Sequence, residues 1–254
     1  MAAGYPGRGI ALDASNNIYI ANTGGNTVFK LDPSGNLLNT FSSVTGASPA
    51  TFSLPIGIDV DASNNIYVAD TMNNRVVEMD GAGAMVTVFS SGGGNSFAEP
   101  QGVALDPSGN LFVADTNNSR TVEFNLARSV IKTFPSGDAG IFADGANNVY
   151  LAYRAGSMTM FNTGGGPITS VYTSGGVSIS LALDVAVNNA GHIFVSDYLQ
   201  SRVLELNPDG STFNIHTGAA GISFNGPAGV AVDGSGNVYV TDLNNGRIFK
   251  YASP

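Results

Sequence analysis

The sequence predicts an all-β fold, a six-bladed β-propeller whose blades are sheets of four antiparallel strands. The main observation is a phrase that returns six times along the chain. Its copies are GIALDASNNIYIAN (9–22), GIDVDASNNIYVAD (57–70), GVALDPSGNLFVAD (102–115), GIFADGANNVYLAY (140–153), DVAVNNAGHIFVSD (184–197) and GVAVDGSGNVYVTD (229–242). Successive copies begin 48, 45, 38, 44 and 45 residues apart. A period of about 40–50 residues made of short strands is typical of a propeller with one blade per repeat.

Composition agrees with this fold. The chain has 254 residues, 43% of them hydrophobic, 11% charged and 33 of them glycine, which is a turn-rich composition with enough apolar residues for a large core. A single blade cannot bury both of its faces, so neighbouring blades must cover it. We therefore expect one domain over residues 1–254, with repeats at about 5–53, 54–98, 99–137, 138–180, 181–225 and 226–254.

The charge of the chain restricts its partners. A net charge of −9 and a pI near 4.4 disfavour nucleic acid and direct contact with anionic membranes. The absence of cysteine excludes disulfides and cysteine-based zinc sites. The opening MAAGYPGRG has no signal-peptide pattern, so we expect a cytoplasmic protein or an extracellular or periplasmic domain taken from a longer exported chain.

Each repeat divides into four predicted strands separated by turn sequences. In the second repeat the strands are expected at 57–61, 65–70, 75–80 and 84–89. In the sixth repeat the third strand ends at Tyr251 and only three residues follow, while the nine residues before Ile10 lack strand-like alternation. We therefore predict an incomplete sixth blade with an exposed edge at 247–251, where another chain could pair in an edge-mediated homodimer.

Four repeats place an aspartate at the end of the second strand and an arginine five residues later. The pairs are Asp70/Arg75, Asp115/Arg120, Asp197/Arg202 and Asp242/Arg247. The first repeat has Asn22 and Thr27 instead, and the fourth has Tyr153 and Ser157, so acid and base are lost together. This joint loss predicts structural ion pairs that hold the loop between the second and third strands. A charged rim for a ligand is the alternative.

Two runs of residues point to a family. The pattern Asp-x-x-Asn-x-Arg-[Val/Ile] occurs at 70–76 and 242–248, and the preceding loops SFAEPQGVALD (96–106) and SFNGPAGVAVD (223–233) carry a phenylalanine and a proline. These features resemble the NHL-repeat β-propellers, most strongly in repeats 2, 3 and 6. The resemblance implies a ligand- or protein-binding module of the kind found in bacterial sensor and envelope proteins, which serves in sensing, adhesion or scaffolding.

The predicted binding site lies on the face from which the longest loops emerge. Such propellers usually bind ligands there. That face carries the residue just before the first strand of each repeat. It also carries the loop after the second strand, which is irregular in the fourth repeat. We expect ligand contacts from Arg8, Gln101, Tyr153, Arg154 and Tyr198. An aromatic ring and a guanidinium on one rim suit a protein or peptide, with carbohydrate as the alternative partner.

A channel metal is the basis of the second functional hypothesis. Asp59 and Asp184 replace small residues in the first strands of their repeats, and carboxylates near the axis could hold calcium. Related propellers include calcium-dependent lactonases and lyases that need histidines, so a hydrolase or lactonase acting in the channel is the alternative to a binding module. The chain has only His192 and His216, which fall in different parts of the fifth repeat. We therefore assign no catalytic residue and expect no cofactor other than this calcium.

Overall fold

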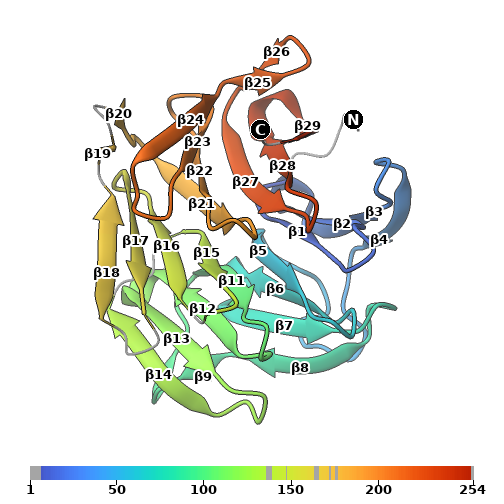
Figure 1. Cartoon of the computed structure of the whole chain (residues 1–254). Helices are drawn as coiled ribbons and strands as arrows, with labels where there is room; N and C mark the ends of the chain where they lie inside the picture. The colour runs from blue at the N-terminus through green and yellow to red at the C-terminus, as the bar shows by residue number, and fades with distance from the viewer. Residues whose placement is uncertain are drawn as a thin grey trace. The chain divides into compact units, whose positions relative to one another are not determined.

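The computed structural model describes residues 7–252 except 136–138, 147, 163–165, 172 and 175–176. It is all-β and has six antiparallel sheets that follow the six repeats, which confirms the predicted β-propeller class (Figure 1). The helices in the described residues are single 3-10 turns. No described helix has the length and apolar character that crossing a membrane would require.

Two compact units divide the chain, at 7–138 and 139–254. We call them the N-terminal and the C-terminal unit. The N-terminal unit contains the first three blades. Their strands are β1 (Ile10–Leu12), β2 (Ile18–Asn22), β3 (Thr27–Leu31) and β4 (Leu37–Phe41), then β5 (Pro55–Val60), β6 (Ile66–Asp70), β7 (Arg75–Met79) and β8 (Met85–Phe89), then β11 (Pro100–Leu105), β12 (Leu111–Asp115), β13 (Arg120–Phe124) and β14 (Val130–Pro135). Within each blade the strands pair in chain order, so the first and the fourth strands are the two edges of the sheet.

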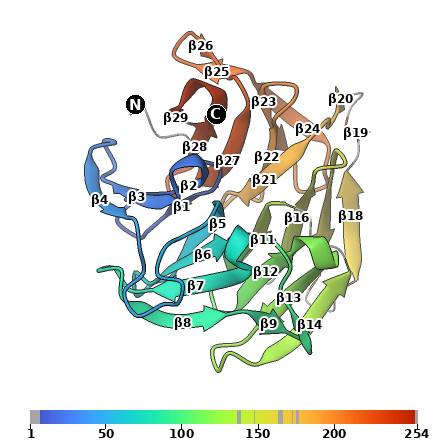
Figure 2. The same ribbon diagram turned by 180° about the vertical axis from the view of Figure 1, so that it is seen from behind.

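The C-terminal unit contains the other three blades. Their strands are β15 (Ile141–Ala143), β16 (Val149–Tyr153), β17 (Ser157–Phe161) and β18 (Pro167–Val171), then β21 (Ala182–Val187), β22 (Ile193–Asp197), β23 (Arg202–Leu206) and β24 (Thr212–His216), then β27 (Pro227–Val232), β28 (Asn237–Asp242) and β29 (Arg247–Ala252). The sixth blade thus has three strands among the described residues, and Figure 2 shows β29 from behind. The prediction that the residues before Ile10 form no strand also concerns residues 1–6, which lie outside the described residues.

Short hairpins lie in three of the connections between blades. They are β9 (Ser91–Gly92) with β10 (Asn95–Ser96), β19 (Thr173–Ser174) with β20 (Val177–Ser178), and β25 (Gly218–Ala219) with β26 (Ile222–Ser223). The second and third strands of a blade are joined by the 3-10 turns η1 (Thr23–Gly25), η2 (Thr71–Asn73), η3 (Thr116–Asn118) and η4 (Leu243–Asn245). In the second, third, fifth and sixth blades, backbone hydrogen bonds join the connection from the preceding blade to the 3-10 turn or loop between the second and third strands.

The cores lie between neighbouring sheets. In the N-terminal unit, Tyr19 and Val28 of the first blade pack with Val68 and Met79 of the second, and all four side chains are fully buried. In the C-terminal unit a similar cluster joins the fifth and sixth blades around Phe194. The apolar residues of both faces of a strand are therefore buried, which explains why the strands read as nearly continuous apolar runs rather than alternating ones.

Glycine lies at or near the start of the first strand because neighbouring first strands pass very close to one another. A Cβ added to Gly57 would lie 2.5 Å from the carbonyl oxygen of Gln101, and one added to Gly140 would lie 2.4 Å from Cα of Asp184. Backbone occupies both places and cannot move aside as a flexible side chain could. The glycine of the repeated phrase is thus a packing requirement.

Candidate binding face

In each unit, the loops between blades and the loops joining the second and third strands emerge on one side, which we call the loop face. The backbone N–H of Met72 in η2 donates to the carbonyl of Ser53, 3.0 Å away, and Asn117 in η3 donates to Ala98 in the same way. In the C-terminal unit the N–H of Tyr198 donates to Leu181. These bonds tie the two kinds of loop together in the second, third and fifth blades.

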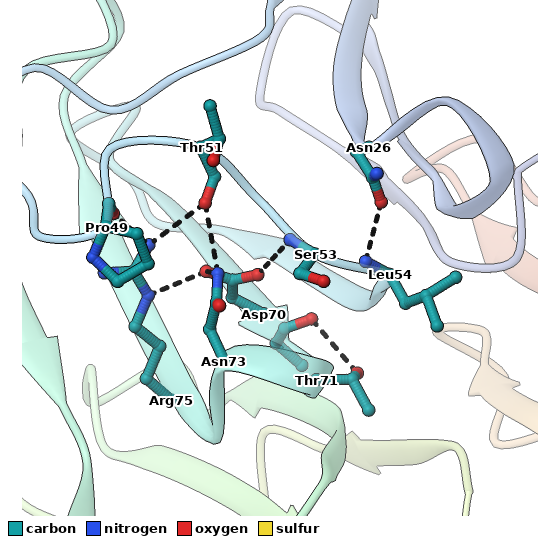
Figure 3. Close-up of polar contacts among 10 residues, drawn as sticks. Asn26, Pro49, Thr51, Ser53, Leu54, Asp70, Thr71, Asn73 and Arg75 are labelled. Atoms are coloured by element: carbon teal, nitrogen blue, oxygen red, sulfur yellow. Dashed lines mark hydrogen bonds and ion pairs between the residues drawn. The ribbon is translucent and has the colours of Figure 1, made fainter.

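A buried network around Asp70 holds the loop face of the second blade (Figure 3). Asp70 is completely buried, and its Oδ1 accepts the N–H of Ser53 at 2.6 Å. Its Oδ2 accepts Nδ2 of Asn73 at 2.9 Å and Nε of Arg75 at 2.7 Å. Nη2 of Arg75 continues to the carbonyl of Pro49 at 2.6 Å. One carboxylate thus joins strand β6, the η2 turn and the loop from the preceding blade.

The third and fifth blades repeat this arrangement. Nε of Arg120 lies 2.7 Å from Asp115, whose other oxygen accepts the N–H of Ala98. Arg202 lies 2.9 Å from Asp197, which is also completely buried. In the first blade the acid and base are replaced by Asn22 and Thr27, which form a neutral hydrogen bond of 2.9 Å. The charged residues therefore bind one another and serve to fix loops.

The predicted pair in the sixth blade is not formed. Asp242 accepts the N–H of Asn225 and Nδ2 of Asn245, both at 2.6 Å, whereas the guanidinium of Arg247 lies over the ring of Phe249, 5.9 Å from its centroid. In the other three blades a carbonyl of the preceding loop also binds the arginine, as Ser178 binds Arg202. Among the described residues no such hydrogen bond joins Arg247 to the β25–β26 connection, so the arginine lacks the second anchor that directs it toward the aspartate.

Large apolar side chains stand exposed on these fixed loops. In the N-terminal unit Leu54 is 42% exposed and Met72 is 49% exposed. Leu54 has a left-handed backbone (φ 50°) and its N–H donates to Oδ1 of Asn26 at 2.8 Å. In the C-terminal unit, Leu199 and Ile222 are 63% and 45% exposed on equivalent loops. The loop face therefore presents apolar groups on backbones that hydrogen bonds hold in place.

The opposite side of each unit, which we call the turn face, is acidic. Its turns share one motif, in which Asp32 accepts the N–H groups of Ser34 and Asn36 and the side chain of Asn36. The hydrogen bonds from Asn36 lower the pKa of Asp32, so this exposed carboxyl is charged at neutral pH. Asp61 and Asp80 make the same turns in the second blade. On the loop face of this unit, in contrast, arginines pair with Asp70 and Asp115.

The five predicted ligand contacts have different surroundings. In the N-terminal unit Arg8 is half-buried and Gln101 is buried in β11. In the C-terminal unit Tyr153 and Arg154 are half-buried. Tyr198 donates its hydroxyl to Oδ1 of Asn244 at 3.3 Å, and its ring fills the space beside Gly226, where a Cβ would lie 2.7 Å from the ring. Tyr198 therefore joins the fifth blade to the sixth.

Asp59 and Asp184 bind backbone groups of the next blade. The two oxygens of Asp59 accept the N–H groups of Val60 at 2.8 Å and Leu105 at 2.7 Å. Those of Asp184 accept the N–H groups of Val185 and Val230, both at 3.0 Å. Burial raises the pKa of Asp59 to about 6, although both hydrogen bonds oppose this shift. Each carboxylate thus bridges neighbouring first strands within its own unit.

The two histidines share one buried carboxylate. Nδ1 of His192 lies 2.8 Å from Oε1 of Glu205, and Nε2 of His216 lies 2.9 Å from Oε2. The rings of Phe213 and Tyr251 pack against His192 and His216 at 4.4 and 4.8 Å. Among the described residues, no cluster of three or more histidine, cysteine, aspartate or glutamate side chains has the arrangement of a metal site.

Comparison with known proteins agrees with the propeller class. A family model described as NHL repeat matches residues 52–78, 97–122 and 224–251, which lie in the second, third and sixth blades. This confirms the resemblance to NHL repeats in the same three repeats, which form blades of a β-propeller. No curated protein matched the sequence.

Solved structures with the same fold include enzymes. A virginiamycin B lyase from Staphylococcus aureus, solved in a catalytically inactive form with quinupristin, is 13% identical, with a TM-score of 0.68 over 97% of this chain and 80% of that one. Hydrazine synthase of Kuenenia stuttgartiensis is 11% identical, with a TM-score of 0.69 over 100% and 97%. A protein provisionally described as a gluconolactonase is 14% identical, with a TM-score of 0.72 over 98% and 89%. At these identities the similarity shows the fold alone.

Sequence reasoning missed the apolar residues of the loop face and the histidine pair. Met72 and Leu199 follow the Asp of the repeated phrase by two residues, so their position was visible, but the pattern does not show that they are exposed. His192 and His216 are 24 residues apart, and both reach Glu205 because the strand of Glu205, β23, pairs with β22 and β24.

Proposed function

We propose that the chain is a binding module that recognises a protein or peptide through its loop face. The observation that carries this proposal is the pairing of exposed apolar side chains with fixed loops. Leu54 and Met72 project from segments that are tied to the buried Asp70 network. A partner that buries these side chains does not have to order the loops first, which reduces the entropic cost of binding.

The distribution of charge supports the same face. Paired arginines neutralise Asp70 and Asp115, and Glu99 is the only other acid among the described residues of the loop face in the N-terminal unit. A partner can therefore cover this surface without stripping water from many free charges, which is costly when they stay unpaired. The acidic turn face offers no such surface and would favour solubility.

A peptide selection with matched variants tests this proposal. Peptides selected from a random display library on the full chain are measured by fluorescence anisotropy against the wild type, Leu54→Asn and Met72→Gln. Asparagine tolerates the left-handed backbone of Leu54, and glutamine keeps the length of methionine. We expect at least about tenfold weaker binding, since central apolar contacts contribute most of the affinity. The control is Leu126→Gln, because Leu126 is 75% exposed in a turn of the turn face.

Three outcomes would contradict the proposal. They are a selection that enriches no peptide, a loss of binding equal to that of Leu126→Gln, and binding only to a glycan array. The last outcome would make the partner a carbohydrate.

A channel enzyme that uses calcium is the second candidate, because solved propellers of this fold include lyases. In this chain Asp59 and Asp184 already accept two backbone N–H groups each, so a cation would have to displace hydrogen bonds that join blades. The candidate is tested by measuring hydrolysis of a panel of lactones and esters with added calcium and with a chelator. Turnover that needs calcium and is lost in Asp59→Asn or Asp184→Asn would favour the enzyme.

A further inference from the structure

The outer edge of β29 differs from the edges of the other third strands. In the other five blades the third strand is paired on both sides, as β7 is paired with β6 and β8. Among the described residues β29 is paired only with β28. Its far side therefore carries backbone N–H and C=O groups that can pair with a further strand.

The other blades define what such a strand must look like. In four of the other five blades the fourth strand places a ring opposite the second residue of the third strand, and the fourth blade has Val171 opposite Met158 instead. The four pairs are Val28↔Phe41, Val76↔Phe89, Thr121↔Phe134 and Val203↔His216. The three phenylalanines are buried. The second residue of β29 is Ile248, and it is also buried. The repeat thus predicts an aromatic side chain opposite Ile248.

Charge narrows the occupant further. Arg247 and Lys250 are the charged residues of β29, and both are basic. Glu123 of the third blade lies opposite Lys132 of β14, so an oppositely charged pair is already used at the position equivalent to Lys250. A second copy of β29 would bring the same two basic residues to the shared edge, and like charges across strands are unfavourable. An acidic or neutral strand suits this edge better than a second copy.

We propose that the outer edge of β29, which no described residue pairs, binds an extended segment of a partner protein by adding it to the sixth blade as an antiparallel fourth strand. The segment carries an aromatic residue opposite Ile248 and an acidic or small polar residue opposite Lys250. Backbone hydrogen bonds supply the affinity, and the ring and the acid supply the specificity. This proposal concerns a different surface from the loop face and does not depend on it.

Disulfide trapping tests the proposal at the level of register. The chain has no cysteine, so an introduced one is unique. The probe is a synthetic peptide with the sequence of residues 84–91, which contains β8. In the second blade Thr87 lies opposite Glu78, the equivalent of Lys250. In the third blade Arg120, the equivalent of Arg247, lies opposite Pro135, the residue after Phe134. In the probe the residue after the equivalent Phe89 is Ser90, so Ser90 should lie opposite Arg247.

Matched and crossed combinations give the decisive comparison. We expect Lys250→Cys to cross-link to the Thr87→Cys peptide, and Arg247→Cys to the Ser90→Cys peptide. The crossed combinations are three residues out of register, about 10 Å apart along a strand, and should not react. In competition, a Thr87→Glu peptide should bind about 2–5 times more tightly than a Thr87→Lys peptide.

The remaining outcomes would overturn the proposal. They are equal yields for matched and crossed pairs, no cross-linking in either variant, and a disulfide-linked homodimer of Lys250→Cys that forms in preference to the peptide adduct. The last result would make a second copy the occupant. Because Lys250 contacts Tyr239 and Asp233, thermal melting checks that this variant is folded. If it is not, the Arg247→Cys combinations decide the question.

Discussion

Replacing Asp70 by asparagine should destabilise the protein far more than a surface substitution would. Asp70 is completely buried and Arg75 is 3% exposed, and their contact is 2.7 Å. The asparagine would keep one acceptor for either Ser53 or the guanidinium, but the positive charge of Arg75 would remain buried without its counter-charge. Breaking a buried ion pair by removing one partner costs about 3–5 kcal/mol, and the retained acceptor places Asp70→Asn near the lower limit, at about 3 kcal/mol.

The first blade supplies the matched control. Its Asn22 and Thr27 occupy the positions of Asp70 and Arg75 and form a neutral hydrogen bond, so the double variant Asp70→Asn/Arg75→Thr copies an arrangement that the chain already uses. The double variant removes the buried charge together with its partner. We expect it to be more stable than the sum of the single variants implies, by about 1.5–3 kcal/mol.

Urea unfolding measured by circular dichroism gives the free energy of unfolding of each variant. The chain has no tryptophan and nine tyrosines, so tyrosine fluorescence is an independent second probe. Additive effects of the two substitutions, within about 0.5 kcal/mol, would show that the pair is not coupled. A cost below about 1 kcal/mol for Asp70→Asn would place the pair in the range of exposed ion pairs and refute its role in holding the loops.

Three further predictions use the same unfolding assay. The pKa of Asp59, about 6 in the folded state, lies above the usual value of about 3.9, so between these pH values the folded protein binds more protons than the unfolded chain. The free energy of unfolding should therefore fall by about 1–3 kcal/mol as pH rises from about 4 to 6. Asp59→Asn should remove this pH dependence, and an unchanged pH dependence would assign it to another group. Gly57→Ala should lower the free energy of unfolding by at least about 1–3 kcal/mol because the new Cβ would lie 2.5 Å from a carbonyl oxygen. The control is Gly24→Ala, whose Cβ would meet nothing within 4 Å and should change stability by under about 0.5 kcal/mol. Equal effects of the two variants would count against close packing of the first strands. Glu205→Gln should cost about 1–3 kcal/mol because an amide offers one oxygen where two histidine nitrogens need acceptors, and a neutral result would mean that the two contacts add no stability.

The fold and the ion pairs could be predicted because their information is local and repeated. The six copies of the phrase each specify a hairpin, and their spacing specifies the blade. Asp70 and Arg75 are five residues apart at the ends of two paired strands, so a short-range register brings them together. The same spacing predicted a pair at Asp242 and Arg247, and that prediction was wrong, because the direction of the arginine also depends on a loop distant in sequence.

The candidate sites depended on contacts that no spacing in the sequence encodes. Glu205 meets His192 and His216 only through the pairing of three strands and a turn. Leu54 precedes a proline, and its exposure follows from a left-handed backbone held by Asn26, 28 residues earlier. The backbone arrangement of Leu54 recurs at Glu99, which Asn74 holds in the same way, but the exposed leucine does not recur there. Sequence patterns report what the blades have in common, whereas the exposed leucine and the histidine pair do not repeat.

This contrast gives a physical reason to place recognition on the loop face. A position that is the same in most copies, such as that of Asp70, is required by the geometry of the blade, because its loss leaves buried groups without partners. Two residues further along, the chain changes freely from copy to copy. The residues there are Gly24, Met72, Asn117, Ala155, Leu199 and Asn244. In three of the copies the backbone N–H at this position donates to a carbonyl of the loop that comes from the preceding blade. The pairs are Met72 to Ser53, Asn117 to Ala98 and Asn244 to Asn225. The side chain at this position therefore differs in its role from blade to blade: Met72 and Leu199 are exposed, whereas Asn244 bonds Tyr198 and Asn225. Under the proposed function, this diversity lets a repeated backbone present a surface that is not itself repetitive.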